Sequence, residues 1–259
     1  MTNFTFFNGI LSILPKRIGN RIKAVHASRF YSGLGVKIHV EKDYFIYNMN
    51  EISFKSYFTD IDDIGLIHPD SDYGYMKRYK IKEGDIVVDA GAYLGLFTLY
   101  AAICAGPTGR VVSFEPDPEN YRKLVMNIKL NGLTNVTIIN KGLYSREGTL
   151  KFNSTASGMS SIDGNGNADV NMTTLDKELL VLGIKKIDFL KMDIEGAEIE
   201  ALRGCSRTLK SSRSSLAIAT YHIVDGDNTS FRVERTLRSF GYDAETRKGG
   251  HMTTYGWKK

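Results

Sequence analysis

The sequence predicts an α/β protein with a doubly wound, mostly parallel sheet that ends in an antiparallel hairpin. Short β-branched runs such as residues 85–91 recur along the chain, and segments with helical periodicity stand between them. Two short strands joined by a tight turn close the chain around residues 248–250, and such strands must be antiparallel.

The elements of this main domain follow one another at short spacing. Glycine or proline ends most of them, as Gly132 does for the helix before it and Pro116 for the second strand. We predict strands at residues 85–91, 110–116, 135–140, 187–193 and 215–222, helices at 96–105, 118–132 and 197–210, and a last helix from residue 231.

Residues 1–68 are predicted to be an extension, made of a helical arm and a β-hairpin at residues 36–58, and residues 69–259 form the main domain. Residues 1–40 hold six basic residues and no acidic one, so the net charge of +5 belongs to the arm. Basic residues after an apolar start fit a helix lying on an anionic membrane surface. Packing on the domain or on a second subunit is the alternative.

Composition bounds the class of protein. Hydrophobic residues make up 42% of the 259 residues and charged residues 24%, as in soluble globular proteins. The two cysteines form no metal-ligand spacing or disulfide framework, which favours a reducing compartment. No segment reaches the roughly 18 apolar residues that span a membrane. We expect a cytoplasmic protein, with peripheral contact at the inner membrane surface through residues 1–30 as an open alternative.

The turn at residues 89–95, DAGAYLG, lies at the carboxyl end of a predicted strand, where open parallel sheets bind ligands. Gly91 allows a tight turn, Ala92 lets a ligand approach the backbone, and Gly95 permits close contact with the helix. A compact strand-to-helix turn that binds nothing has the same glycine pattern.

Two carboxylates favour a nucleoside ligand with a positive charge. Glu115 ends the second strand, where it can accept hydrogen bonds from both hydroxyls of a ribose. Asp89 precedes the turn, in a position that disfavours a pyrophosphate and favours a cation. S-Adenosylmethionine carries a sulfonium and no phosphate, so we expect this cofactor rather than NAD.

A second group of charged residues lies within residues 188–202, DFLKMDIEGAEIEAL. Lys191, Asp193 and Glu195 crowd the end of a central strand, next to the first turn. Carboxylates also favour the start of a helix, and this alternative suits Glu200 on the solvent face.

Four stretches together resemble the FkbM-type family of class I S-adenosylmethionine-dependent methyltransferases. They are VVDAGAYLGLFTLYAA, FEPDPENYRKLVMNIKLNGLTNV, TTLDKE and IDFLKMDIEGAEIEALRG, and they keep their order over about residues 70–257. The resemblance implies a Rossmann-like sheet of seven strands with an antiparallel last strand. It also implies O-methylation of a small molecule, usually a sugar, glycan or glycolipid.

The resemblance also implies roles for single residues. It places Asp89, Gly91, Ala92, Tyr93 and Gly95 at the methionine end of the cofactor, Glu115 and the adjoining Pro116 at the ribose, Gly142 and Leu143 at the adenine, and Asp193 and Glu195 at the junction with the substrate.

Methyl transfer to a hydroxyl is helped by a group that accepts the hydroxyl proton. His222, at the end of a predicted strand, is the preferred candidate because imidazole accepts a proton near neutral pH. Asp193 is the second candidate, and Lys191 is expected to act structurally or electrostatically. A histidine bonded only to the backbone is the alternative for His222.

A metal ion is not expected. Asp193 and Glu195 offer the oxygen ligands of a hard cation, but the spacing shows no third ligand. The remaining histidines show no ligand spacing and are expected to be ordinary surface or core residues: His26, His39, His68 and His251.

Residues 153–169 are rich in Gly, Ser and Asn and predict a mobile loop near the sheet edge that carries the cofactor site, either a substrate lid or a surface excursion.

An RNA or protein methyltransferase is one alternative function, although the nearly neutral main domain makes nucleic acid an unexpected partner. A nucleotide-binding protein without methyl transfer is another. Whether the protein forms a homo-oligomer is left open.

Overall fold

The computed structural model describes residues 15–60, 62–72, 74–153, 161–162, 166, 168–248 and 251–258. Its centre is a seven-stranded sheet in the order β15-β16-β12-β11-β4-β5-β6. The strands are β4 (Ile86–Ala90), β5 (Arg110–Phe114), β6 (Val136–Ile139), β11 (Phe189–Met192), β12 (Ser215–Ala219), β15 (Asp243–Arg247) and β16 (Thr253–Trp257).

Strands β6, β5, β4, β11 and β12 are parallel, and the last strand of the chain, β16, runs antiparallel between β12 and β15. The predicted fold class, a doubly wound and mostly parallel sheet with a reversed last strand, is therefore confirmed. The carboxyl ends of β4 and β11 lie side by side, because Lys191 pairs with Asp89 and Met192 with Ala90. This register brings the two predicted site segments together.

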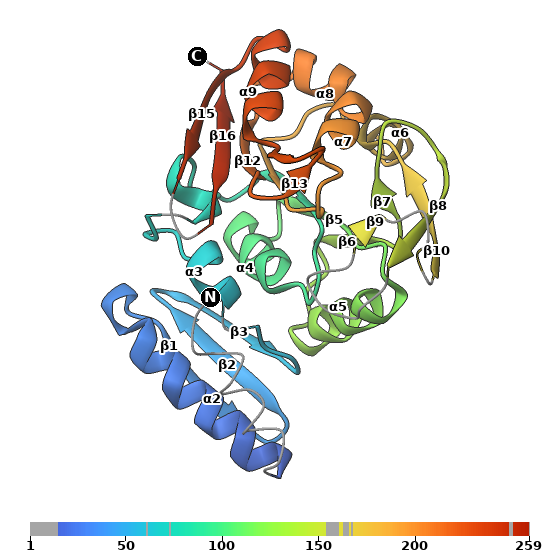
Figure 1. The fold of residues 1–259 in the computed structure, drawn as a ribbon. Coiled ribbons are helices and arrows are strands. Elements are labelled where there is room, and N and C mark those ends of the chain that lie inside the picture. Colours follow the sequence, from blue (N-terminus) through green and yellow to red (C-terminus); the bar gives the residue numbers. More distant parts are fainter. Residues whose placement is uncertain are drawn as a thin grey trace.

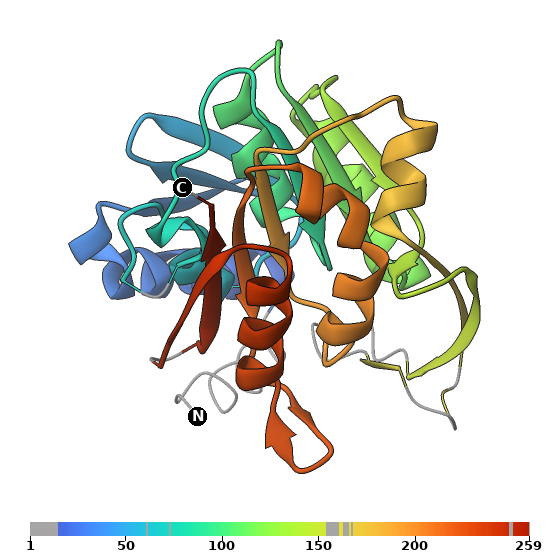
Figure 2. The same ribbon diagram turned by 90° about the horizontal axis from the view of Figure 1, so that it is seen from above.

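Alternate residues of the strands enter two different hydrophobic clusters. Val87 and Val111 pack with α4 (Leu96–Ala105) and α5 (Pro118–Leu130) on one face. Their neighbours Val88 and Val112 pack on the other face with α6 (Leu175–Val181), α7 (Glu198–Gly204), α8 (Ser206–Ser211) and α9 (Ser230–Ser239). Helices cover both faces (Figures 1 and 2), as expected for a parallel sheet.

The N-terminal extension contains three strands and not two. Strands β1 (Lys37–Glu41), β2 (Tyr44–Met49) and β3 (Ile52–Ser56) form an antiparallel sheet in that order. The predicted hairpin is thus a three-stranded meander, because two tight turns interrupt residues 36–58 instead of one. The asparagine at the second turn, Asn50, adopts a left-handed φ of 53°.

Helix α2 (Lys16–Phe30) runs along the outer side of this small sheet (Figure 1). It buries Gly19, Ala24 and Ala27 and leaves Ile18, Val25 and other apolar residues exposed. The described part of the arm therefore packs on the extension's own sheet. Residues 1–14 lie outside the described residues, and contact with a membrane or a second subunit stays a prediction. Among the described helices, none is both long and apolar enough to cross a bilayer.

The extension is joined to the main domain through its hydrophobic core. Phe54 of β3 and Ile64 of α3 (Asp62–Ile67) belong to the same cluster as Leu99 of α4. Asn127 of α5 accepts a hydrogen bond from the backbone N–H of Tyr57, and Asn131, just after the helix, bonds both backbone groups of Lys55. The division at residue 68 stays a prediction, since the two parts share one core.

A second small sheet follows β6, with the order β7-β10-β8-β9. It is made of β7 (Gly142–Leu143), β8 (Gly148–Asn153), β9 (Ser161–Ile162) and β10 (Ala168–Thr173), and β13 (Ile223–Val224) and β14 (Asp227–Asn228) form a separate short hairpin. The predicted loop at residues 153–169 is therefore partly strand. The lid interpretation depends mainly on residues 154–160, 163–165 and 167, which lie outside the described residues.

Candidate active site

A cavity of about 350 Å³ opens at the carboxyl ends of β4, β5 and β11. Ten of the thirteen predicted site residues line it: Gly91, Ala92, Tyr93, Glu115, Pro116, Gly142, Leu143, Lys191, Asp193 and Glu195. The other three lie behind this wall. Asp89 is fully buried, Gly95 begins α4 against Leu124, and His222 contacts the carboxylates after β11.

The turn after β4 is built around Gly91. Its φ is 78°, and a Cβ atom added there would lie 1.8 Å from the carbonyl oxygen of Asp193. Its backbone N–H and that of Ala92 both donate to the carbonyl of Phe114. The glycine is thus required for the close approach of the β4 turn to the segment after β11, more than for approach of a ligand.

Glu115 is the carboxylate that is expected from the sequence to bind the ribose. It is 5% exposed, and its two oxygens accept hydrogen bonds from the backbone N–H groups of Tyr93 (2.7 Å) and Asp117 (3.0 Å). Asp117 also caps α5, which holds this segment in place. Burial raises the pKa of Glu115 to about 7, partly offset by the two N–H donors.

Asp89 and Lys191 form a buried ion pair. The Lys191 Nζ lies 3.1 Å from Asp89 Oδ1 and donates to the carbonyl of Gly91 at 2.6 Å. Asp89 Oδ2 accepts from Thr98. Burial alone would lower the pKa of Lys191, but the charges of Asp89 and Asp193 raise it above its ordinary value. Lys191 is therefore a fixed positive charge and not a base. It neutralises Asp89, the carboxylate that is expected from the sequence to contact the cofactor.

Asp193 is surrounded by hydrogen-bond donors. Its Oδ2 accepts from Tyr75 (2.7 Å) and lies 3.5 Å from His251 Nε2, and its Oδ1 accepts from Tyr221 (3.4 Å). Burial would raise the pKa of Asp193, but His251, Lys191 and His222 hold it below its ordinary value. Asp193 therefore stays ionised and is a poor acceptor of a substrate proton.

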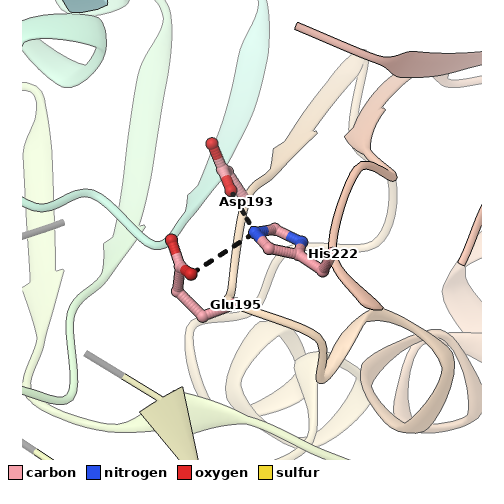
Figure 3. Close-up of side chains that lie close together, drawn as sticks. All are labelled: Asp193, Glu195 and His222. Atoms are coloured by element: carbon pink, nitrogen blue, oxygen red, sulfur yellow. Dashed lines mark ion pairs between the residues drawn. The ribbon is translucent and has the colours of Figure 1, made fainter. Parts of the chain in front are cut away.

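His222 faces three carboxylates. Its Nε2 lies 3.5 Å from Asp193 Oδ1 and 3.5 Å from Glu195 Oε2 (Figure 3), and its Nδ1 lies 2.9 Å from Glu198 Oε1. Burial would lower the pKa of His222, but Glu195 and Glu198 raise it to about 10. With this proton in place the ring cannot act as a base, so the base role expected for His222 requires the neutral imidazole and stays a prediction.

Sequence reasoning did not find several residues that line the cavity. Tyr75 comes from η2 (Tyr75–Lys77), and His251 precedes β16, so both reach the site from distant parts of the chain. His251 was expected to be an ordinary residue, because it has no neighbour in sequence with which to form a motif. Asp60, Asp63, Leu66 and Ile67 of the extension also line the cavity.

The raised pKa of Glu115 predicts a pH-dependent stability. A carboxyl group with an ordinary pKa of 4.5 and a folded pKa of about 7 binds its proton more tightly in the folded state. Its contribution is therefore complete below pH 4.5 and is lost as the pH rises to about 7, by about 3 kcal/mol. We expect wild type to lose this much relative to Glu115→Gln between pH 4.5 and 8.

Urea unfolding of the ligand-free proteins at several pH values measures this difference. Asp117 and Lys191 are the charged groups that face Glu115, and both remain in the variant. A difference between the two proteins that does not change with pH would contradict the prediction.

The order of the sheet, its reversed last strand and a cavity at the carboxyl ends of the strands define the class I methyltransferase fold. The crystal structure of methyltransferase FkbM from Methylobacillus flagellatus KT aligns with a TM-score of 0.54 at 20% identity, over 70% of this chain and 45% of that one. At this identity the likeness shows the fold.

Sequence comparison gives the family. The family described as "Methyltransferase FkbM domain" matches residues 89–244. Methyltransferase sdnD of Sordaria araneosa is 33% identical over 193 residues, which is 61% of this chain and 73% of that protein. Hexuronic acid methyltransferase AglP of Haloferax volcanii is 30% identical over 134 residues, which is 50% of this chain and only 54% of that protein. This chain belongs to the FkbM family of S-adenosylmethionine-dependent methyltransferases.

Proposed function

We propose that this protein binds S-adenosylmethionine in the cavity and methylates a hydroxyl group of a sugar, glycan or glycolipid. The acidic wall at the junction end of the cavity carries this proposal. Asp60, Asp63, Asp193 and Glu195 all line the cavity, as do Tyr75 and Tyr221, whose hydroxyls donate to Asp193. Carboxylates accept hydrogen bonds from hydroxyl groups, so this wall suits a polyhydroxylated acceptor.

The cofactor end offers groups that fit a nucleoside. Glu115 faces the cavity, and the carboxylate can accept from ribose hydroxyls. Asn120 also lines the cavity, is 2% exposed, and its Oδ1 has no hydrogen-bond partner among the described residues. A buried acceptor of this kind is costly unless a ligand supplies a donor. We assign Gly142 and Leu143 to the adenine and the turn at residues 91–93 to the methionine end.

S-Adenosylmethionine, when bound, supplies a methyl group on a positively charged sulfur. The protein's part is to hold the acceptor oxygen in line and to exclude water. Leu66, Ile67 and Phe97 provide an apolar wall, and Asp193 and Glu195 orient the acceptor hydroxyl. The negative wall disfavours a polyanionic substrate, which supports a small hydroxylated molecule over RNA.

The name of the relative AglP also favours a sugar acceptor, since that protein is described as acting on a hexuronic acid. Without a bound cation, a carboxylate on the acceptor would be repelled by Asp60, Asp63, Asp193 and Glu195. We therefore expect the metal-free protein to prefer neutral sugars to uronic acids.

Calorimetric titration with S-adenosylhomocysteine and, separately, NAD tests the cofactor assignment. We expect the first to bind with micromolar affinity and the second not at all. At about pH 8, above the pKa of about 7 of Glu115, Glu115→Ala should weaken binding about 100-fold or more, because two hydrogen bonds to a charged group are lost.

Glu119→Ala is the matched control, since Glu119 is about half exposed and pairs with Lys123 at the surface. Equal binding by Glu115→Ala and Glu119→Ala would remove Glu115 from the cofactor site. A screen of neutral sugars, uronic acids, RNA and amines for methyl acceptance then tests the substrate class. Transfer to RNA or amines, with none to sugars, would refute the hydroxyl proposal.

A further inference from the structure

Three side chains beside the cavity converge on one point. Asp193 and Glu195 follow β11 and His222 follows β12, and one ligand atom from each lies within 4.8 Å of the others. In Figure 3 the two carboxylates point to the same ring nitrogen of His222. Ligands about 2.0–2.2 Å from a metal ion lie roughly 3–4 Å from one another. The two separations of 3.5 Å from His222 Nε2 to Asp193 Oδ1 and Glu195 Oε2 suit one ion between these groups.

The backbone directs these groups toward one another. Glu195 has a left-handed φ of 55°, which is unusual for a residue with a side chain. The following Gly196 is also left-handed, and a Cβ there would lie 3.1 Å from Val224. The loop after β11 is thus tightly packed against the segment that carries His222.

His222 provides the independent observation that points to a ligand. Its side chain is only 7% exposed, yet neither ring nitrogen makes a hydrogen bond of good geometry within the described part of the chain, and only Nδ1 has a carboxylate oxygen as close as 2.9 Å. The two carboxylate oxygens near Nε2 lie 3.5 Å away, which is long for a hydrogen bond and leaves room for an ion between them.

Glu198 completes the arrangement on the other side of the ring. It is fully buried at the start of α7, and its Oε1 lies 2.9 Å from His222 Nδ1. A carboxylate beside one ring nitrogen favours the proton there and leaves the opposite nitrogen as a ligand. Histidine ligands of metals typically have a carboxylate beside one ring nitrogen while the other nitrogen binds the metal. Glu198 and the open side of His222 have this arrangement.

We propose that Asp193, Glu195 and His222 bind a divalent cation that accepts both oxygen and imidazole ligands, such as Mn²⁺ or Zn²⁺. Three protein ligands leave positions for water and for an oxygen of the acceptor. Asp193 and Glu195 also line the cavity, so a cation held between them borders the space of the acceptor.

One part of this inference rests on the proposed function. A hydroxyl oxygen bound to the cation would release its proton to water more readily, and the protein would then need no neutral histidine as a base. The binding of the cation itself does not depend on the reaction.

The test uses the full chain, treated with a chelator and then freed of it, without S-adenosylmethionine or acceptor. MnCl₂ binding is followed by electron paramagnetic resonance and ZnCl₂ binding by calorimetry. We expect one ion per chain. Replacing a ligand should weaken binding by more than the roughly 10- to 100-fold that loss of an outer-shell partner costs, so both His222→Gln and Glu195→Gln should exceed this range. Pulsed measurements should show coupling of Mn²⁺ to a nitrogen nucleus, and His222→Gln should lose this signal.

Glu200→Gln is the matched control, because Glu200 lies on the same helix as Glu198 but pairs with Arg203 at the surface. It should bind both ions as wild type does. Titration of each variant with S-adenosylhomocysteine shows that the cofactor end is intact, and Glu195→Gln serves if His222→Gln does not fold.

Failure of wild type to bind either ion, or unchanged binding in both variants, would overturn the proposal. Cation binding without methyl transfer to any hydroxyl would overturn the proposed function alone. Binding of S-adenosylhomocysteine and methyl transfer by a protein that binds neither ion would overturn this inference alone.

Discussion

Gly91→Ala should destabilise the protein by about 3 kcal/mol or more and weaken binding of S-adenosylhomocysteine at least 100-fold. The new Cβ would overlap the carbonyl oxygen of Asp193, 1.8 Å away, in a backbone conformation that alanine adopts poorly. Backbone atoms cannot move aside as a flexible side chain can. The turn after β4 and the segment after β11 must therefore separate, and both line the cavity.

Urea unfolding and calorimetric titration measure the two effects. Gly33→Ala is the control, because a Cβ at Gly33 would meet no described atom within 4 Å. It should change stability by no more than about 0.5 kcal/mol. A Gly91→Ala protein as stable as Gly33→Ala would show that the two segments are not held in contact.

Lys191→Met is expected to cost about 3–5 kcal/mol, because it leaves the carboxylate of Asp89 buried without its counter-ion. Asp89 is fully buried, and after the substitution the hydroxyl of Thr98 is its remaining side-chain donor among the described residues. Adding Asp89→Asn should recover part of the loss, since the amide carries no charge. The free energy of urea unfolding of the single and double variants measures both changes.

Lys80→Met provides the same substitution in an exposed ion pair. Lys80 Nζ lies 2.9 Å from Asp70 Oδ1, and both side chains are more than half exposed. Solvent screens such a pair, so we expect a change of about 0–1 kcal/mol. If Lys191→Met cost no more than Lys80→Met, the buried pair would not be needed to neutralise Asp89.

The sequence predicts well what depends on local pattern and strand order. The strands that contain Asp89 or end just before Glu115 and Asp193 are short, largely apolar runs, and the parallel arrangement places their carboxyl ends at one edge. The turn at residues 89–95 was predicted to contact a ligand. Its Gly91 is needed first for a close contact with the backbone of Asp193, about 100 residues further along the chain.

Interactions between distant segments were not predictable. The proton affinity of His222 is set by Glu195 and Glu198, which reach it from the loop after β11 and the start of α7. No spacing in the sequence shows that His222 is a third group beside Asp193 and Glu195. His251 could have been found only from the pairing of β16 with β12.

Some elements differ from the prediction for local reasons. The helix expected over residues 197–210 is divided into α7 and α8 at Cys205. Gly204 packs so closely on the carbonyl of Tyr144 that no Cβ fits there. Strands β8 and β10 were not predicted, because their polar sequences have few of the β-branched runs that marked the central strands.

Four residues of the extension line the cavity although they lie outside the region that the family match covers. The family match spans residues 89–244, whereas Asp60, Asp63, Leu66 and Ile67 precede it. Under the proposed function, the acceptor wall is thus shared: the extension contributes Asp60 and Asp63, and the matched region contributes Asp193 and Glu195. A relative with a different extension would keep the second pair of carboxylates and lose the first, so its cavity would offer an acceptor a different set of hydrogen-bond acceptors.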